Sequence, residues 1–321
     1  MIDLHEPPIT VIIPLFNKVA TIGRAISSVL SQTYGSFELI VVDDGSTDLS
    51  ASVVKSFSDS RLRLISQANM GVSAARNCGI ASAKHELLAF LDADDYWDSR
   101  FLEVIVHLCR DFPMASWYAT ACAIVLPGVP GDALTKSTPR ISTTRGIVKN
   151  FFVAATNADA LVTSSSVAIQ RSAIQSIGCF PVGIASGEDM LTWSKIAVQY
   201  DLAVDPQRLA VWDVSGINRR PDRERLVEKQ LIGIYRQSRR LPGLRQYIGK
   251  WIRIQAELSL IDNDNLLGRR AALRSIYYSP KSFKSWYIAS IFMLPFPDKL
   301  RVHKSIKVLM KYFMSRRDGQ S

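Results

Sequence analysis

Three carboxylates stand together in residues 87–97, which read LLAFLDADDYW. Asp92, Asp94 and Asp95 fall within four residues, so they repel one another unless a cation lies between them. Hard divalent ions such as Mg²⁺ and Mn²⁺ prefer oxygen ligands and are commonly shared with substrate phosphates. The segment therefore indicates a metal-assisted site for a phosphate-bearing substrate. The simpler alternative is that Asp94 or Asp95 caps a helix expected from about Ser99.

A second group of carboxylates, DDGSTD at residues 43–48, follows the apolar run at residues 37–42. Unbroken apolar runs such as this one and residues 87–91 are typical of strands that are buried on both faces of a parallel sheet. In open α/β sheets, ligands bind just outside the carboxyl ends of the strands. Both acidic groups should therefore lie along one edge of the same sheet.

Strand-like and helix-like segments alternate along the first hundred residues, which is typical of a doubly wound α/β sheet. We expect strands at 9–15, 37–42, 61–66, 87–91, 115–125, 161–170 and 209–216, and helices at about 20–34, 69–84 and 146–157. The glycine-rich dinucleotide fingerprint and the P-loop pattern are both missing from the sequence. A dehydrogenase or an ATPase is therefore disfavoured, which leaves a sheet that binds a nucleotide through carboxylates and a metal ion.

Four segments, in this order and spacing, resemble glycosyltransferase family 2. They are IIPLFN (12–17), LIVVDDGSTD (39–48), NMGVSAARNCGI (69–80) and FLDADDYW (90–97), and the resemblance covers about residues 8–215. It implies a GT-A type α/β fold, with a mostly parallel sheet flanked by helices and a Rossmann-like nucleotide-binding half. It also implies an inverting transfer of a sugar from a nucleotide-diphosphate donor, for which we favour a UDP-sugar.

The resemblance places the metal and the phosphates of the donor at the fourth segment. The family's Asp-x-Asp motif falls on Asp92-Ala93-Asp94, with Asp94 as the direct ligand of Mn²⁺ or Mg²⁺ and Asp92 beside it. Arg76 would reach the donor phosphates. A bound metal and an arginine together neutralise a diphosphate leaving group. The alternative for Arg76 is a solvated position on the surface of a helix.

The resemblance places the nucleobase at the first two expected strands. Asp43 would contact the base, with Asp44 nearby, because a carboxylate oxygen can accept a hydrogen bond from a base N–H. Pro14, Phe16 and Asn17 would line the pocket. The alternative is that residues 43–48 form only a turn.

A third acidic site follows in residues 177–193, IGCFPVGIASGEDMLTW. It resembles the family's Gly-x-Glu-Asp block, which implies Asp189 as the general base for the acceptor hydroxyl and Glu188 as its neighbour. Ser186 and Asp189 also match a helix-capping pattern, which explains an acid here without catalysis. The resemblance weakens after the last expected strand, because residues 212–215 lack the histidine or arginine-histidine pair of many relatives; Asp213 or the arginines at 219 and 220 could substitute.

The excess of positive charge is confined to the last third of the chain. Residues 1–218 contain 16 Lys plus Arg against 21 Asp plus Glu, whereas residues 219–321 contain 23 against 8, so the net charge of +10 divides into −5 and +15. We expect a catalytic domain at 1–218 and a basic helical extension at 219–321, with helices at about 225–240, 244–261, 266–278 and 297–314.

The extension contains the most apolar run of the chain, WYIASIFMLPF at residues 286–296, which is too short to span a bilayer. Together with the basic amphipathic segment at 297–314, it suits the surface of an anionic membrane. Packing of these apolar faces on the catalytic domain is the alternative.

The expected protein is an enzyme of the hexosyltransferase type that extends a saccharide or lipid-linked saccharide in cell-surface polysaccharide synthesis. The four scattered cysteines and the lack of a signal peptide at the N-terminus predict a cytoplasmic location, peripheral to the inner face of the plasma membrane. Residues 126–145, rich in Pro, Gly, Ser and Thr, are expected to form a loop that covers the sugar or admits the acceptor.

Three other classes of function fit the sequence less well. A sugar nucleotidyltransferase is disfavoured because its glycine-rich, arginine-containing start is missing after the first strand. A catalytically inactive protein that binds a sugar nucleotide or a polysaccharide is the main alternative, which the intact Asp92, Asp94 and Asp189 disfavour. No nucleic-acid partner is expected, because the basic extension carries no recognition motif and the acidic body would repel phosphates.

Overall fold

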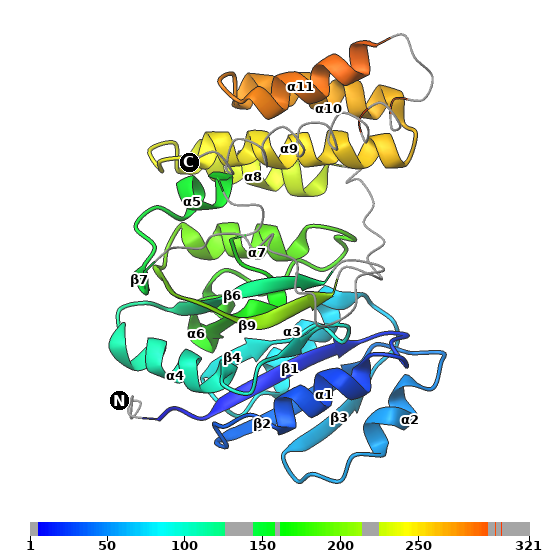
Figure 1. The fold of residues 1–321 in the computed structure, drawn as a ribbon, viewed down its shortest axis with the longest axis vertical. Helices are drawn as coiled ribbons and strands as arrows, with labels where there is room; N and C mark the ends of the chain where they lie inside the picture. Colours follow the sequence, from blue (N-terminus) through cyan, green and yellow to red (C-terminus); the bar gives the residue numbers. More distant parts are fainter. Residues whose placement is uncertain are drawn as a thin grey trace, which may run out of the picture. The chain divides into compact units, whose positions relative to one another are not determined.

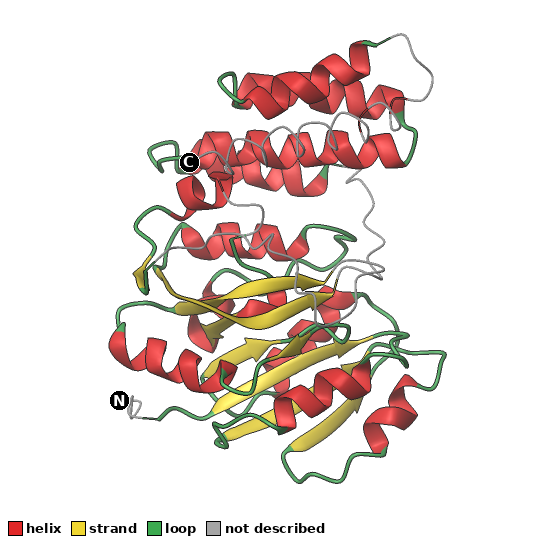
Figure 2. Cartoon of the chain, in the orientation of Figure 1, coloured by secondary structure: helices red, strands yellow, loops and turns green. Residues whose placement is uncertain are grey.

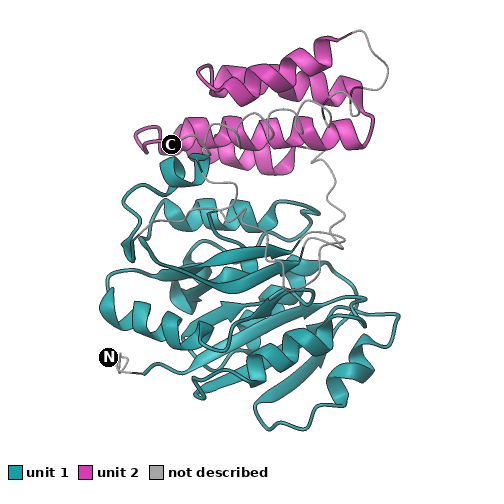
Figure 3. Cartoon of the chain, viewed as in Figure 1, with its two compact units in different colours: residues 1–218 teal, residues 219–321 magenta. Residues whose placement is uncertain are grey.

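The computed structural model describes residues 6–125, 144–157, 161–213 and 225–294, together with Lys299 and His303. The chain divides into two compact units, Met1–Asn218 and Arg219–Ser321 (Figure 3). This boundary is the position at which the charge of the sequence changes sign. Most of the loop expected at 126–145 and of the helix expected at 297–314 lies outside the described residues.

The first unit is built around a mixed sheet with the strand order β3-β2-β1-β4-β8-β6-β9-β5 in the described part of the chain, with β7 paired to β9 (Figure 1). The strands are β1 (Ile9–Leu15), β2 (Phe37–Asp43), β3 (Leu62–Ser66), β4 (Leu87–Phe90), β5 (Tyr96–Trp97), β6 (Trp117–Val125), β7 (Gly146–Ile147), β8 (Val167–Gln170) and β9 (Leu202–Asp213). Strands β3, β2, β1 and β4 are parallel, so their carboxyl ends meet at one edge.

Helices flank this sheet (Figure 2). They are α1 (Ile22–Leu30), α2 (Ser50–Lys55), α3 (Val72–Ser82), α4 (Phe101–Asp111), α5 (Phe151–Asn157), α6 (Arg171–Ser176) and α7 (Glu188–Ala197). The predicted α/β fold with a mostly parallel sheet is therefore confirmed. Within the sheet, β8 is antiparallel to both β4 and β6, and β6 and β9 are parallel to each other.

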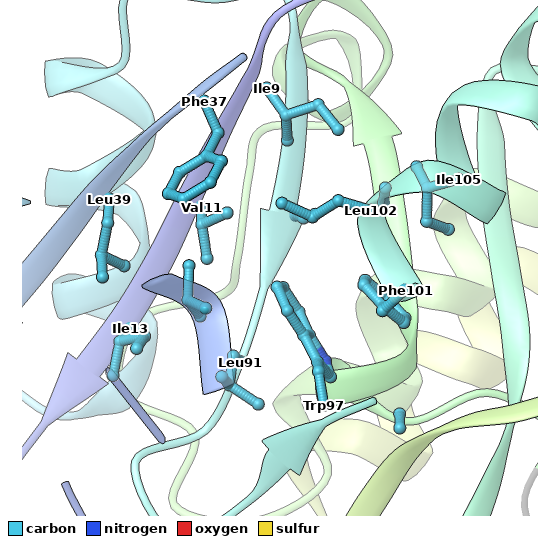
Figure 4. Packing of buried hydrophobic residues seen from close by; sticks show 14 of the residues in the cluster. Ile9, Val11, Ile13, Phe37, Leu39, Leu91, Trp97, Phe101, Leu102 and Ile105 are labelled. Carbon is cyan, nitrogen blue, oxygen red and sulfur yellow. The ribbon is translucent and has the colours of Figure 1, made fainter. Parts of the chain in front are cut away.

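The parallel strands β1, β2 and β4 are buried on both faces, which explains their largely apolar sequences, whereas β3 at the edge of the sheet is only partly buried. Along β2, Leu39 and Val41 belong to the cluster that also contains residues of α1 and α4 (Figure 4), whereas Ile40 and Val42 pack with Ala75 of α3. Because successive residues of a strand point to opposite faces, a strand covered on both sides is apolar throughout.

Three element predictions need correction. The strand expected at 161–170 is a 3₁₀ turn at Ser164–Ser166 followed by the short β8, and the helix expected at 146–157 is β7 followed by α5. The last strand begins at Leu202 rather than at residue 209. Polar residues and Pro206 interrupt its apolar pattern, and its register with β6 is irregular near Thr120 and Ala121.

The second unit is helical in its described part, as predicted. Its helices are α8 (Leu226–Gln237), α9 (Leu244–Ile261), α10 (Asn265–Tyr278) and α11 (Phe283–Met293). Helix α9 packs against α8, α10 and α11, and α10 packs against α11 (Figure 1). Asp264 caps α10 and Ser282 caps α11, each through its side-chain oxygen. None of the helices in the described ranges combines the length and the apolar character that crossing a membrane requires.

Candidate active site

A cavity of about 380 Å³ is lined by the end of β1 and the loop after it, by residues that follow β2 and β4, by the start of α3 and the loop before it, and by the start of α7. The predicted site residues that line it are Pro14, Phe16, Asp44, Arg76, Asp92, Ala93, Asp94 and Glu188. Asn17, Asp43 and Asp189 are not among its lining residues. Residues from three separate acidic segments of the sequence are thus brought to one cavity.

Asp94 is paired with a cation that the sequence did not single out. The Lys18 ammonium nitrogen lies 2.6 Å from Asp94 Oδ2, and Lys18 also lines the cavity. The main-chain oxygen of Asp94 accepts a hydrogen bond from Arg24, which also donates to Asp213 Oδ2 at 2.9 Å. Asp213, which the sequence offered as a substitute ligand, therefore pairs with an arginine of α1, whereas residues 219 and 220 lie outside the described ranges.

Arg76 is a buried cation of the cavity wall, and its interpretation as a solvated helix residue is wrong. Its side chain is 2% exposed, and it donates to Asp92 Oδ1 at 2.7 Å and to Glu188 Oε1 at 3.0 Å. Its guanidinium carbon lies 5.0 Å from the centre of the Phe180 ring. Although burial opposes the charged form, Asp92 and Glu188 hold the pKa of Arg76 above its ordinary value. The cavity thus has a permanent positive charge in its wall.

Asp95, the third carboxylate of the LDADD segment, is buried and forms hydrogen bonds within the protein. Its Oδ2 accepts a hydrogen bond from the Ser165 hydroxyl, and its Oδ1 accepts one from the main-chain N–H of Asp213 at 2.9 Å. Burial, reinforced by the charge of Asp92, raises the pKa of Asp95 well above the usual range of a carboxyl. The hydroxyl of Ser165 also accepts from the N–H of Asp92 at 3.0 Å, so the same contacts hold the strand end in place.

Neither Asp94 nor Asp95 caps the helix that follows. Helix α4 begins at Phe101, and the carboxylate that accepts a main-chain N–H at this turn is Asp98, from Arg100 at 3.0 Å. The capping alternative for this stretch is therefore wrong.

Asp44 holds the loop that leads into α3. Its Oδ1 accepts hydrogen bonds from Gln67 Nε2 at 2.7 Å and from the N–H of Met70 at 2.9 Å, and its Oδ2 accepts from the N–H of Gly71 at 2.8 Å. Asp43 accepts the N–H of Ser46 at 3.1 Å. Residues 43–48 therefore do form a turn, and one carboxylate of that turn also lines the cavity.

Asn17 ties the loop after β1 to the same turn. Its main chain has a φ of 51°, in the left-handed region, and its Oδ1 accepts the N–H of Thr47 at 2.8 Å and that of Asp48 at 3.3 Å. Asparagine tolerates this conformation better than most residues. Asn17 thus positions Phe16 and Lys18, which line the cavity on either side of it in the sequence.

Glu188 and Asp189 form the first turn of α7, directly after Gly187 in the left-handed conformation. Glu188 is buried; burial and the charge of Asp189 raise its pKa, and Arg76 opposes that rise. Asp189 is half-buried, and its Oδ1 accepts the N–H of Met190 at 2.6 Å. The cap residue is Gly187, and no side-chain hydrogen bond caps the helix, so the predicted cap by Ser186 is not formed.

The donor set at Asp92 and Asp94 suits a hard divalent ion only when other oxygens complete its shell. Among the described residues, no group of three or more His, Cys, Asp or Glu side chains is arranged to hold a metal. Each of the two carboxylates has one oxygen paired with a cation, Asp94 with Lys18 and Asp92 with Arg76. Magnesium-type ions are commonly held by one or two carboxylates together with substrate phosphates, and these two residues fit that pattern.

Residues 10–121 match the family profile described as Glycosyl transferase family 2. This segment is a family 2 glycosyltransferase domain. It runs from β1 into β6 and supplies every residue that lines the cavity except Glu188. The predicted resemblance is thereby confirmed for the part of the chain that forms the cavity.

Two curated relatives align with the family 2 domain. The chain is 36% identical over 122 residues to the glycosyltransferase GlyA of Streptococcus pneumoniae, covering 36% of this chain and 18% of GlyA. It is 41% identical over 101 residues to the UDP-Glc:alpha-D-GlcNAc-diphosphoundecaprenol beta-1,3-glucosyltransferase WfgD of Escherichia coli, covering 31% of this chain and 40% of WfgD. The chain thus spans less than half the length of these relatives.

Solved structures extend the likeness beyond the family 2 domain. The crystal structure of S. aureus TarS 1-349 in complex with UDP-GlcNAc has a TM-score of 0.66 and 17% identity, covering 84% of this chain and 81% of that one. The mannosyltransferase PcManGT from Pyrobaculum calidifontis, in complex with GDP-Man and Mn²⁺, has a TM-score of 0.52 and 18% identity, covering 95% and 81%. These matches confirm the predicted GT-A type fold.

Proposed function

We propose that the chain is an inverting glycosyltransferase that moves a sugar from a nucleoside diphosphate donor to a saccharide or lipid-linked saccharide acceptor. The observation that carries the proposal is the cavity of the family 2 domain, where Asp92 and Asp94 lie beside the cations Arg76 and Lys18. Its volume of about 380 Å³ is at the lower end of the range typical of small-molecule sites.

The donor diphosphate is bound by the cations of the cavity wall. Arg76 is held in place by Asp92 and Glu188 and cannot lose its charge, so it presents a fixed positive group to the leaving group. Lys18 is more exposed and can turn from Asp94 to a phosphate oxygen. We favour a UDP-sugar, because the name of WfgD specifies UDP-Glc and the TarS structure contains UDP-GlcNAc.

Asp94, with Asp92 beside it, would hold a Mn²⁺ or Mg²⁺ ion together with the donor phosphates. When bound, the ion supplies positive charge that stabilises the departing diphosphate. The Mn²⁺ ion in the PcManGT structure supports this assignment by analogy.

Asp189 is proposed as the general base that takes the proton of the acceptor hydroxyl. Glu188 is paired with Arg76 in the cavity wall, whereas Asp189 is half-buried and has no ion pair with that arginine. Asp189 Oδ1 accepts the N–H of Met190, which fixes the orientation of the carboxylate. Inverting transfer needs one base opposite the leaving group, and a carboxylate placed in this way can serve.

The basic helical extension, with a net charge of +15 over residues 219–321, is proposed to contact an anionic membrane at the cytoplasmic face, where it would meet a lipid-linked acceptor. The lipid-linked acceptor named for WfgD supports this part of the proposal.

Calorimetric titration of the full chain with UDP, GDP and dTDP, first with Mn²⁺ and then with EDTA, tests the proposal. We expect binding of one nucleotide, dependent on the metal and lost in Asp94→Asn. Asp201→Asn is the matched control, because Asp201 is an exposed carboxylate of the same unit outside the cavity. If none of the three nucleotides binds, the proposal fails.

A catalytically inactive protein with the same fold remains the second candidate. It shares the cavity and the nucleotide affinity, so calorimetry does not separate the two. Hydrolysis or transfer of the sugar from the bound donor in the presence of saccharide acceptors does, and its complete absence would favour the inactive protein.

A further inference from the structure

Helices α10 and α11 each expose a stripe of large apolar side chains. On α10 the stripe consists of Leu266, Leu273 and Tyr277, and on α11 it consists of Phe283, Trp286 and Met293. Spacings of three, four and seven residues place the members of each stripe on one side of their helix. The exposed fractions of Tyr277, Phe283 and Trp286 are 69%, 67% and 56%, which is unusual for aromatic residues so close together in sequence.

The charges in this helical pair are all positive. Residues 265–294 contain five Lys and Arg side chains and no Asp or Glu. They are Arg269, Arg270, Arg274, Lys281 and Lys284. Arg274 pairs with Glu228 of α8, whereas the other four are exposed. An apolar surface on helices whose own charged side chains are all cationic is complementary to a surface that is itself apolar and anionic.

The turn between the two helices holds its aromatic residues in place. Trp286 Nε1–H donates to the main-chain oxygen of Pro280 at 2.8 Å, and Ser282 accepts the N–H of Ser285 at 3.2 Å as the cap of α11. The ring of Phe283 stacks with that of Tyr287, with their centres 6.5 Å apart. The exposed rings are therefore presented from a rigid turn and lose little conformational freedom on binding.

We propose that the exposed stripes of α10 and α11, together with Lys281 and Lys284, form a face that lies on an anionic lipid bilayer. Aromatic rings favour the level of the lipid headgroups, and lysines next to them are attracted to anionic lipids. This inference rests on the proposed function and names the residues of the second unit that would make its membrane contact. It assigns that contact to the exposed sides of α10 and α11, so that part of the sequence-predicted run 286–296 belongs to the face and α11 lies in the plane of the membrane.

Flotation of the full chain with vesicles of phosphatidylcholine, with and without phosphatidylglycerol, tests the inference. We expect binding only to the anionic vesicles, with an affinity that falls as salt is raised. Lys281→Gln with Lys284→Gln should lower the partition coefficient about thirtyfold. Phe283→Ser with Trp286→Ser should lower it about tenfold or more, because the apolar area that enters the headgroup region is lost.

Met114→Ser is the matched control, because Met114 is an exposed apolar residue of the first unit and its loss should leave vesicle binding unchanged. Circular dichroism melting of each variant identifies any loss of folding. Binding that is equal for all variants, or no binding to anionic vesicles, would overturn the inference. So would a dimer of the native chain that the Phe283/Trp286 variant dissociates, because a second copy would then cover the face. Nucleotide titration is measured separately, so the failure of either proposal can be told from failure of the other.

Discussion

Ion pairs at the cavity fix where its charged side chains stand. Arg76 joins Asp92 to Glu188, and Lys18 joins the loop after β1 to Asp94. Groups that are already oriented need little reorganisation when a charged ligand enters, which is the main source of electrostatic stabilisation in active sites. The two cations differ in exposure: Arg76 is buried, whereas the side chain of Lys18 is 34% exposed.

Lys18→Gln should weaken the binding of UDP about tenfold or more, because the diphosphate loses a charged hydrogen-bond donor. The free energy of unfolding should change little, because a half-exposed ion pair contributes little to stability. Calorimetry at saturating Mn²⁺ measures the affinity, and Lys55→Gln, an exposed lysine at the end of α2, is the control. Equal affinity of the variant and the native chain would remove Lys18 from the donor site.

Asp189→Asn should retain donor binding and lower the rate of transfer by about 10²- to 10⁴-fold, since the amide cannot take the proton of the acceptor. Single-turnover transfer and UDP titration on the same preparation separate the two effects. A variant that transfers at the native rate would show that another group is the base, with Glu188 the next residue to examine.

Residues of the site were predictable where their own segment carries a pattern, and not where a distant partner decides their role. Asp92 and Asp94 follow an apolar run, and both line the cavity. Lys18 and Arg24 stand 76 and 70 positions from Asp94, and only the sheet order brings them to it. Asn17 shows the reverse case. The resemblance suggested a pocket residue, whereas its side-chain oxygen accepts hydrogen bonds from the main-chain N–H groups of Thr47 and Asp48.

At the scale of elements, close packing of α3 on β1 sets the position of Arg76. A methyl group at Gly79 of α3 would overlap Ile12 of β1, so the helix approaches the strand more closely there than any other residue type allows. Arg76 lies in the same helix, one turn earlier. The glycine therefore contributes to the geometry of the cavity without touching it.

Gly79→Ala should lower the free energy of unfolding by about 1 to 3 kcal/mol, since either the helix or Ile12 must shift. Gly23→Ala on α1 is the control: its added methyl would meet Val53 at 3.6 Å, an ordinary contact, and alanine favours the helix by up to about 1 kcal/mol. Urea unfolding followed by tryptophan fluorescence gives both values. Equal stability of the two variants would contradict the close packing.

Strands β1, β2 and β4 were predictable because strands buried on both faces have continuous apolar sequences. Strands β8 and β9, in the other half of the sheet, were harder to predict from the sequence. In β9, Pro206 and the polar residues beside it hide the first part of the strand. The antiparallel direction of β8 depends on its neighbours β4 and β6 and has no signal in its own four residues.

At the scale of the whole molecule, the two units have opposite charge and different proposed tasks. The proposed transfer cavity belongs to the first unit, and the α10–α11 face belongs to the second. The balance of charge along the sequence changes sign at the boundary between these two units. The exposed stripes were not predictable, because the sequence alone does not tell which apolar side of a helix is covered by its neighbours.

With a lipid-linked acceptor, transfer by the native chain should be faster in anionic than in neutral vesicles, because the membrane concentrates enzyme and acceptor together. Phe283→Ser with Trp286→Ser should abolish this gain. The rate of this double variant with a water-soluble saccharide acceptor should equal that of the native chain, since neither residue belongs to the cavity. Loss of both rates would indicate a damaged fold instead.

The charge of the cavity wall also bears on whether the donor enters alone or together with its metal ion. Four carboxylates, those of Asp44, Asp92, Asp94 and Glu188, face two cations, Lys18 and Arg76, a formal balance of −2. A nucleoside diphosphate is itself anionic, so a bare donor approaches a wall of its own sign. We therefore expect the donor to enter as its complex with Mn²⁺ or Mg²⁺. Raising the donor concentration would then not compensate for a shortage of the ion.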